Sequence, residues 1–149
     1  MLAYRNVGDI IGKAIQWETA LRGFYEVAEV ALKNPESRKL VVVLREKLVE
    51  RLRILQELDV KKYGNAEWVK FVPAVADDEI VPKVSITRSS DPRQVFEVIL
   101  GVDEKLERFY GSLAGSLVSR EQKELFQSLA LFKAEQIESI KGYMAQSGS

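Results

Sequence analysis

Apolar residues recur at alternating spacings of three and four along four long segments of the chain. This spacing puts them on one face of a helix and predicts four amphipathic helices, at about residues 7–32, 36–58, 92–117 and 120–144. Asn34-Pro35 separates the first two segments, since proline cannot continue a helix. Asp91 and Pro92 suit the N-cap and first helical position of the third. We therefore expect an all-α fold.

The helical pattern repeats along the chain at one constant separation, that between Glu18 and Asp103. We call this separation the repeat offset. Glu18 corresponds to Asp103, and with the same separation Phe24-Tyr25 corresponds to Phe109-Tyr110. The repeat indicates an internal duplication, in which helical hairpins at about 7–58 and 90–144 form one domain over residues 1–149. The matches also continue through the turns, as Leu21/Leu106, Leu32/Leu117, Leu40/Leu125, Leu44/Leu129 and Glu50/Glu135.

A long connection at about residues 59–89 joins the hairpins. Its length allows the chain to cross over from one end of a bundle to the other. We expect Trp68, Phe71 and Val72 to hold this connection against the helices, because a solvated linker would not need large apolar side chains. The acidic run Asp77-Asp78-Glu79 is typical of a solvated loop, with a weak surface cation site as the alternative.

A few polar residues interrupt the apolar seams at matched places. Glu18, Arg51, Asp103 and Gln136 each lie about 16 or 17 residues from a hairpin turn, which is about 25 Å at 1.5 Å per residue. They are therefore expected at one level near the middle of the bundle. Lys133 lies one helical turn from Gln136 on the same face.

This layout resembles the rubrerythrin family of the ferritin-like di-iron carboxylate proteins. The resemblance implies a ferritin-like four-helix bundle with a long crossover between the second and third helices. In that family two single glutamates and two Glu-x-x-His pairs hold the metal. Glu18 and Asp103 match the single carboxylates, whereas Leu48-x-x-Arg51 and Lys133-x-x-Gln136 stand at the paired positions. The resemblance therefore implies a degenerate metal site. We expect no bound metal, no cofactor and no catalytic residue, and the alternative is a site that still binds iron.

Charge balance offers a replacement for the metal. Two seam carboxylates would face Arg51 and Lys133, which gives a neutral core if Glu18 lies near Arg51 and Asp103 lies near Lys133 or Gln136. In the alternative, the long side chains of Arg51 and Lys133 reach solvent, or a rotated helix exposes both acids. Tyr25 and Tyr110 fit core aromatics better than redox groups.

Composition narrows the chemistry. The chain has no cysteine and no histidine, which excludes disulfides, thiol and imidazole catalysis, and zinc or haem sites that need these ligands. Twenty-two basic residues balance twenty-two acidic ones, so no net field attracts nucleic acid. No apolar run is long enough to span a membrane, and the N-terminus lacks a secretory pattern. We expect a cytoplasmic protein.

Our leading functional hypothesis is a non-catalytic, metal-free binding or assembly module with an unknown protein partner. The alternative is a di-iron or mono-metal oxidoreductase or peroxidase with a non-standard carboxylate site. A helical bundle unrelated to ferritins is a third hypothesis, which the polar cluster disfavours. Six off-seam apolar residues require a cover, either the connection or a second copy in a homodimer: Val42, Val43, Leu52, Ile54, Leu131 and Phe132.

Overall fold

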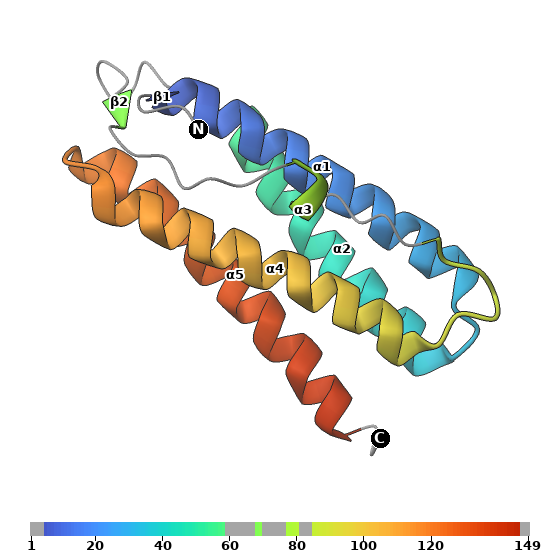
Figure 1. The fold of residues 1–149 in the computed structure, drawn as a ribbon. Helices are drawn as coiled ribbons and strands as arrows, with labels where there is room; N and C mark the ends of the chain where they lie inside the picture. The colour runs from blue at the N-terminus through green and yellow to red at the C-terminus, as the bar shows by residue number, and fades with distance from the viewer. Residues whose placement is uncertain (1–4, 59–67, 70–76, 81–84, 147–149) are drawn as a thin grey trace.

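Four long helices make up most of the fold (Figure 1). The computed structural model describes residues 5–58, 68–69, 77–80 and 85–146. The long helices are α1 (Val7–Ala31), α2 (Pro35–Gln56), α4 (Pro92–Ser116) and α5 (Arg120–Gln146). The prediction of four helices is confirmed, and the helix ends lie close to the predicted positions. Two short strands and one short helix complete the described part: β1 (Arg5–Asn6), β2 (Trp68–Val69) and α3 (Asp77–Ile80).

Polar side chains cap the helices. The Asn6 side chain accepts a hydrogen bond from the Gly8 amide at the start of α1, and Asp91 accepts one from the Arg93 amide at the start of α4. Asn34 accepts two such bonds at the start of α2. Each bond satisfies an amide that has no partner within the first helical turn. Local sequence therefore sets where these helices begin.

The repeat offset extends to the helix boundaries. It separates Val7 from Pro92, the first residues of α1 and α4, and it also separates the first residues of α2 and α5. The caps Asn6 and Asp91 share this separation. Ser119, the counterpart of Asn34, likewise accepts a hydrogen bond from the amide of the third residue beyond it. The two hairpins thus match in their helix starts as well as in their seams.

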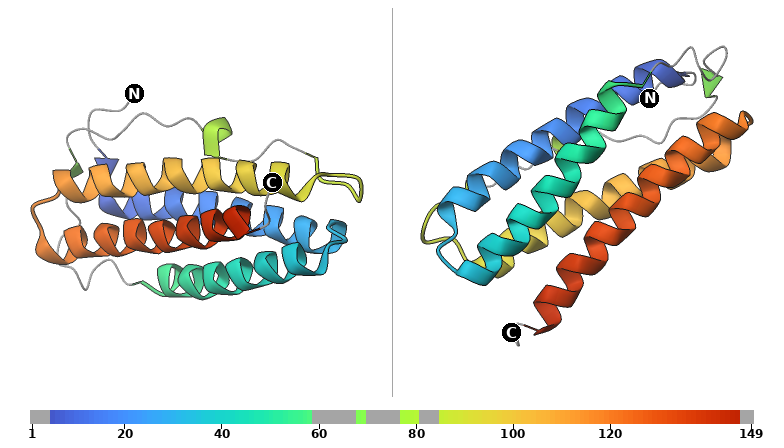
Figure 2. Two further views of the ribbon diagram at one scale, coloured as in Figure 1. Left: turned by 90° about the horizontal axis from the view of Figure 1, so that it is seen from below. Right: turned by 180° about the vertical axis from the view of Figure 1, so that it is seen from behind.

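The helices pack as two antiparallel hairpins around one core (Figures 1 and 2). α1 pairs with α2, and α4 pairs with α5. α4 runs opposite to α1, so α2 and α4 point the same way. A ring contact joins the hairpins, with the centroids of Trp17 and Phe109 5.1 Å apart. The core lies between the four helices and contains, among others, Leu21, Leu44, Leu48, Phe96, Leu106, Phe126 and Ile140.

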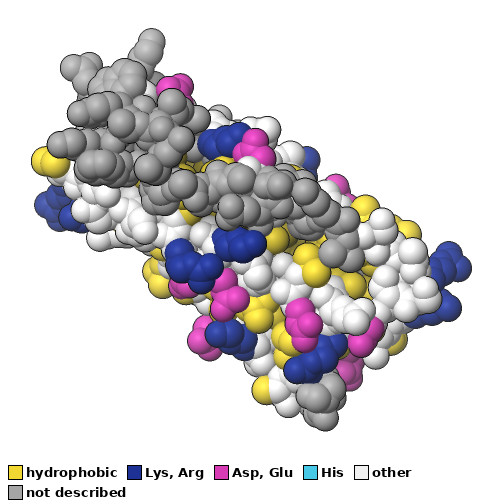
Figure 3. Space-filling view, viewed as in Figure 1, with side chains coloured by type: hydrophobic (Ala, Val, Ile, Leu, Met, Phe, Trp, Pro, Cys, Tyr) yellow, Lys and Arg dark blue, Asp and Glu magenta, His cyan; other side chains and the backbone are white. Residues whose placement is uncertain are grey.

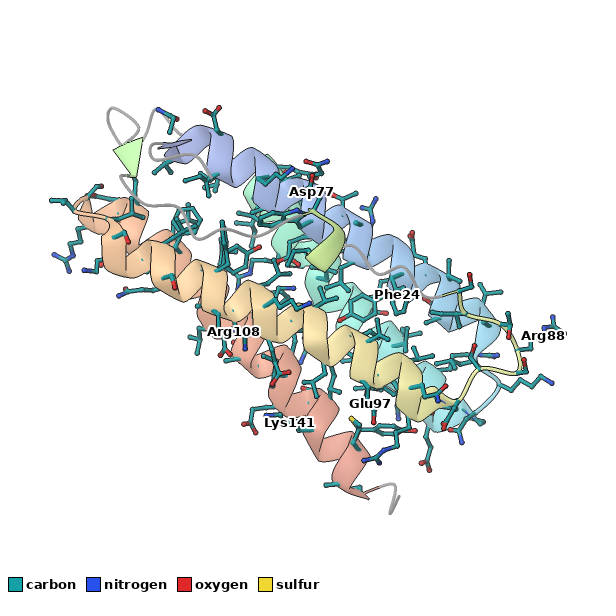
Figure 4. All side chains as sticks on the ribbon, in the orientation of Figure 1. Phe24, Asp77, Arg88, Glu97, Arg108 and Lys141 are labelled. Atoms are coloured by element: carbon teal, nitrogen blue, oxygen red, sulfur yellow. The ribbon has the colours of Figure 1, made fainter. Side chains whose placement is uncertain are left out.

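The described pieces of the connection contact the hairpins. β2 pairs antiparallel with β1, with Asn6 opposite Trp68. On α3, the Asp77 carboxylate accepts a hydrogen bond from Trp17 Nε1 at 2.9 Å and pairs with Lys13 at 2.6 Å (Figure 4). Ile80 is buried. Asp77-Asp78-Glu79 form a helix held to α1 where a loop was predicted, whereas the exposure of Asp77 agrees with the predicted solvation. Phe71 and Val72 lie outside the described residues.

The outer surface mixes charges of both signs (Figure 3). Ion pairs between Arg53 and Glu57 and between Arg120 and Glu124 lie one turn apart on their helices. No helix in the described part of the chain is both long and apolar enough to cross a membrane. Of the six off-seam apolar residues, Leu52 and Phe132 are buried within this chain and Val42 is half-buried. Only three of the six stay exposed: Val43, Ile54 and Leu131.

Candidate functional site

A polar cluster is buried in the middle of the bundle. Glu18 comes from α1, Asp103 from α4, and Lys133 and Gln136 from α5. All four side chains are 1 % exposed or less. The alternatives in which Lys133 reaches solvent or the two acids face water are therefore wrong. Charged groups at this depth require partners, because burial removes their hydration.

Lys133 lies between the two carboxylates. Its Nζ donates to Glu18 Oε1 at 2.5 Å and to Asp103 Oδ1 at 3.1 Å. The expected proximity of Asp103 and Lys133 is confirmed. The ammonium contacts α1 and α4 from α5, so a single charge joins both hairpins. Gln136, one turn further along α5, donates to the Leu44 carbonyl at 3.1 Å and so links α5 to α2.

Tyr110 completes the environment of Glu18. Its hydroxyl donates to Glu18 Oε2 at 2.8 Å, so each carboxylate oxygen of Glu18 has a partner. Tyr110 itself packs against Phe109 and Phe126, with ring centroids 6.0 and 6.3 Å away. Burial, followed by the charge of Glu18 and the bond to it, raises the pKa of Tyr110 well above its ordinary value. Tyr110 therefore remains a neutral donor at physiological pH.

Arg51 lies outside this cluster, which corrects the predicted Glu18–Arg51 pair. Its guanidinium donates to Ser128 Oγ at 3.3 Å and stacks 5.1 Å from the centre of the Phe132 ring. Arg51 is half-buried and lines a surface groove between α2 and α5. A long arginine side chain can follow an apolar surface outward and keep its charge in water. The expected balance of two negative and two positive charges in the core is therefore wrong as well.

With Arg51 outside, Glu18 and Asp103 share one cation. Burial raises the pKa of Asp103 to about 6, although the charge and hydrogen bond of Lys133 act in the opposite direction. Burial alone would lower the pKa of Lys133, but Asp103 and Glu18 together raise it above its ordinary value. Lys133 therefore stays protonated, and Asp103 takes up a proton at a higher pH than an ordinary aspartate does.

The first hairpin lacks the bonds that Lys133 and Tyr110 of the second hairpin make. Leu48 is the counterpart of Lys133 under the repeat offset, and it is fully buried and apolar. Tyr25 is the counterpart of Tyr110. Within the described residues, Tyr25 Oη and Asp103 Oδ2 are buried without a hydrogen-bond partner. The cluster is thus asymmetric, although it is built on a symmetric pattern.

Two further buried polar residues were not anticipated from the sequence. Ser37 and Gln122 are 1 % exposed or less, and they are counterparts under the repeat offset. The Ser37 hydroxyl is 2.5 Å from the Tyr143 hydroxyl, which links α2 to α5. Their matched positions in the repeat were the available signal, because seam polar residues recur in pairs. Neither residue is among the hydrogen-bond partners of Lys133.

The donor set does not fit a di-iron centre. Within the described ranges, no group of three or more histidine, cysteine, aspartate or glutamate side chains could hold a metal ion. Glu18 and Asp103 are the carboxylates at the centre, and the Lys133 ammonium stands between them where a cation would have to bind. A positive group repels a metal ion and offers it no lone pair.

The cluster is also poorly suited to acid–base or nucleophilic catalysis. A protonated lysine is neither a base nor a nucleophile, and both oxygens of Glu18 are already engaged. All members are shielded from solvent, so no substrate reaches them in this structure. The geometry instead describes an ion-pair network that joins α1, α4 and α5, beside a separate hydrogen bond from Gln136 to α2.

Comparison with known proteins adds no relative: no protein-family model, no curated protein and no solved structure matches the chain.

Proposed function

We propose that this chain is a non-catalytic, metal-free, rubrerythrin-like member of the ferritin-like bundles, in which a lysine has taken the place of the metal. It would act in the cytoplasm as a binding or assembly module. The supporting observation is the position of Lys133 Nζ, fully buried and bonded to both Glu18 and Asp103.

Charge compensation explains why such a replacement is physically reasonable. Two facing carboxylates in a helical core need a cation, because unpaired buried charges are strongly destabilising. A lysine supplies one positive charge and three N–H donors from a fixed place on α5. The bundle then needs no metal to fold.

The ferritin-like part of the proposal also rests on the repeat. Helix starts, N-caps, seam carboxylates and Phe-Tyr pairs all recur at the repeat offset. We infer that the chain is an internal duplication of a helical hairpin, with residues 59–89 crossing over between the halves. The parallel directions of α2 and α4 support this inference (Figure 1).

Metal content tests the proposal directly. The wild-type protein, expressed in iron-supplemented medium and purified without chelator, should contain far less than one iron, manganese or zinc ion per chain by elemental analysis. It should also unfold at the same urea concentration with and without added iron, since a ligand that binds only the folded state would raise that concentration. Stoichiometric metal in the unmodified protein would instead support the oxidoreductase alternative.

Self-association is the simplest form of an assembly role. Leu131 on α5 is 63 % exposed, and Val43 and Ile54 on α2 are 39 % exposed each. If these exposed residues pair two copies, sedimentation velocity should show a dimer for the wild type and a monomer for Leu131→Lys. Val118→Lys, at a residue 89 % exposed just before α5, is the matched control and should leave the dimer intact. A monomeric wild type would leave a different protein partner as the proposed role.

A further inference from the structure

The repeat places two tyrosine–carboxylate pairs in the core, and only one of them is bonded. Tyr110 on α4 donates to Glu18 on α1 at 2.8 Å. The symmetric pair is Tyr25 on α1 and Asp103 on α4. Tyr25 is fully buried, Asp103 is equally buried, and within the described residues Tyr25 Oη and Asp103 Oδ2 have no partner.

The difference follows from side-chain length. Asp103 is one methylene shorter than its counterpart Glu18, so its carboxylate lies about 1.5 Å nearer its own backbone. Its other oxygen, Oδ1, is held by Lys133 and cannot turn toward Tyr25 without breaking that bond. The negative charge of Asp103 still raises the pKa of Tyr25, after the larger effect of burial. Tyr25 and Asp103 hold the positions in the repeat that Tyr110 and Glu18 hold, so the two groups lie on facing helices without a direct hydrogen bond.

Leaving both groups unpaired would be costly. An unsatisfied buried hydroxyl or carboxylate oxygen loses its hydration without compensation, and native proteins rarely tolerate this. Two such atoms, one a donor and the other an acceptor, face the same polar cluster. This combination is what a small hydrogen-bonding ligand requires.

We propose that Tyr25 Oη and Asp103 Oδ2 form a binding site for one buried water molecule. The water accepts a hydrogen bond from the Tyr25 hydroxyl and donates one to Asp103 Oδ2. Lys133 has three N–H groups and uses two of them for Glu18 and Asp103, so its third is a further donor for the water. Buried waters typically make about three such bonds.

Other occupants fit less well. A metal or alkali cation needs several oxygen ligands, and Lys133 places a positive charge beside the same site. A proton on Asp103 Oδ2 would make that atom a donor that needs an acceptor, and no direct bond joins it to Tyr25 Oη. The fourth helix contributes no polar group here, since Leu48 fills the position opposite Lys133. One water molecule pairs both Tyr25 Oη and Asp103 Oδ2.

A matched pair of tyrosine variants tests the site. Tyr25→Phe and Tyr110→Phe each remove one hydroxyl at equivalent positions of the repeat. If water bridges Tyr25 to Asp103, Tyr25→Phe should lower the melting temperature by an amount similar to Tyr110→Phe. If Tyr25 has no partner, its removal should leave the melting temperature unchanged or raise it, and that result would overturn the proposal.

A high-resolution crystal structure of the wild-type protein should show density within hydrogen-bonding distance of both Tyr25 Oη and Asp103 Oδ2. In Asp103→Glu, which restores the longer side chain found at position 18, this density should disappear and Tyr25 should bond directly to the new carboxylate. Absence of density in the wild type, or density with the short contacts of a coordinated cation, would contradict the water site.

Discussion

The Lys133 ammonium and the Glu18 carboxylate meet in the centre of the bundle, where Nζ lies 2.5 Å from Oε1. The two residues are far apart in sequence and belong to different hairpins. The same ammonium also bonds Asp103 on α4. One buried cation therefore connects three helices, and the stability of the bundle should depend on it more than on any surface charge.

Removing the charge of Lys133 should be strongly destabilising. Lys133→Met keeps an unbranched side chain of similar length but leaves two buried carboxylates without their cation. We expect the free energy of unfolding to fall by about 3–5 kcal/mol, measured by urea denaturation followed by circular dichroism.

Lys141→Met is the matched control on the same helix. Lys141 is 57 % exposed and lies 4.0 Å from Glu104, so its loss should change stability by less than about 0.5 kcal/mol. Equal effects in the two variants would show that Lys133 is not the central cation.

Arg51 should behave differently from Lys133, although both interrupt an apolar seam. Arg51→Leu removes a stacking contact with Phe132 and a long hydrogen bond to Ser128, but it leaves no buried carboxylate unpaired. We expect a loss of about 0.5–1 kcal/mol in the same urea experiment. A loss as large as that of Lys133→Met would mean that Arg51 reaches Glu18 in solution.

The helices could be predicted closely because their signals are local. Asn34-Pro35 and Asp91-Pro92 mark helix starts through caps and fixed backbone angles, whatever the tertiary structure. The short helix α3 could not be predicted in this way. Four residues are too few to form a stable helix alone. α3 is held by contacts of Asp77 with Trp17 and Lys13, which a local sequence pattern does not predict.

The central site could be predicted in position but only partly in connectivity. Seam periodicity indicates which face of a helix a residue occupies, and it correctly brought Asp103 and Lys133 together. It does not indicate where the end of a long side chain lies. Arg51 turns outward along Phe132, and Lys133 extends far enough to reach Glu18 as well. The choice between these directions depends on desolvation and packing from all four helices.

Asp103 predicts an unusual pH dependence. Its folded pKa, about 6, is above its unfolded value of 3.8, because burial disfavours the charged form. Its contribution to stability is therefore fully present below about pH 4 and is lost as pH rises through about 6. The difference in unfolding free energy between wild type and Asp103→Asn should shift against the wild type by up to about 3 kcal/mol between about pH 4 and pH 7.5. Urea titrations at both pH values measure this shift. A difference that stays constant would contradict the raised pKa, since carboxylates outside the buried cluster titrate equally in both proteins.

Restoring the missing ligands should convert the cluster into a metal site. The variant Leu48→Glu, Arg51→His, Lys133→Glu and Gln136→His places Glu-x-x-His on both α2 and α5, opposite Glu18 and Asp103. It removes the central ammonium and supplies the oxygen and nitrogen lone pairs that first-row metals require. We expect this variant to bind iron or zinc by elemental analysis, and to gain stability on adding metal because metal binds only the folded site.

The matched control for this variant replaces both new glutamates by glutamine, as Leu48→Gln and Lys133→Gln, and keeps the two histidines. Glutamine has nearly the same shape as glutamate but no negative charge, so the control should bind metal much more weakly. Equal metal binding in both proteins would locate the metal elsewhere on the chain. A folded variant that binds none would show that positions 48, 51, 133 and 136 do not converge on Glu18 and Asp103.

Position 51 is the most demanding of these, because Arg51 points outward while its counterpart Gln136 is buried. The Cα positions of the two residues are equivalent in the repeat, so the shorter histidine at 51 should turn inward once no charge draws the side chain to the surface.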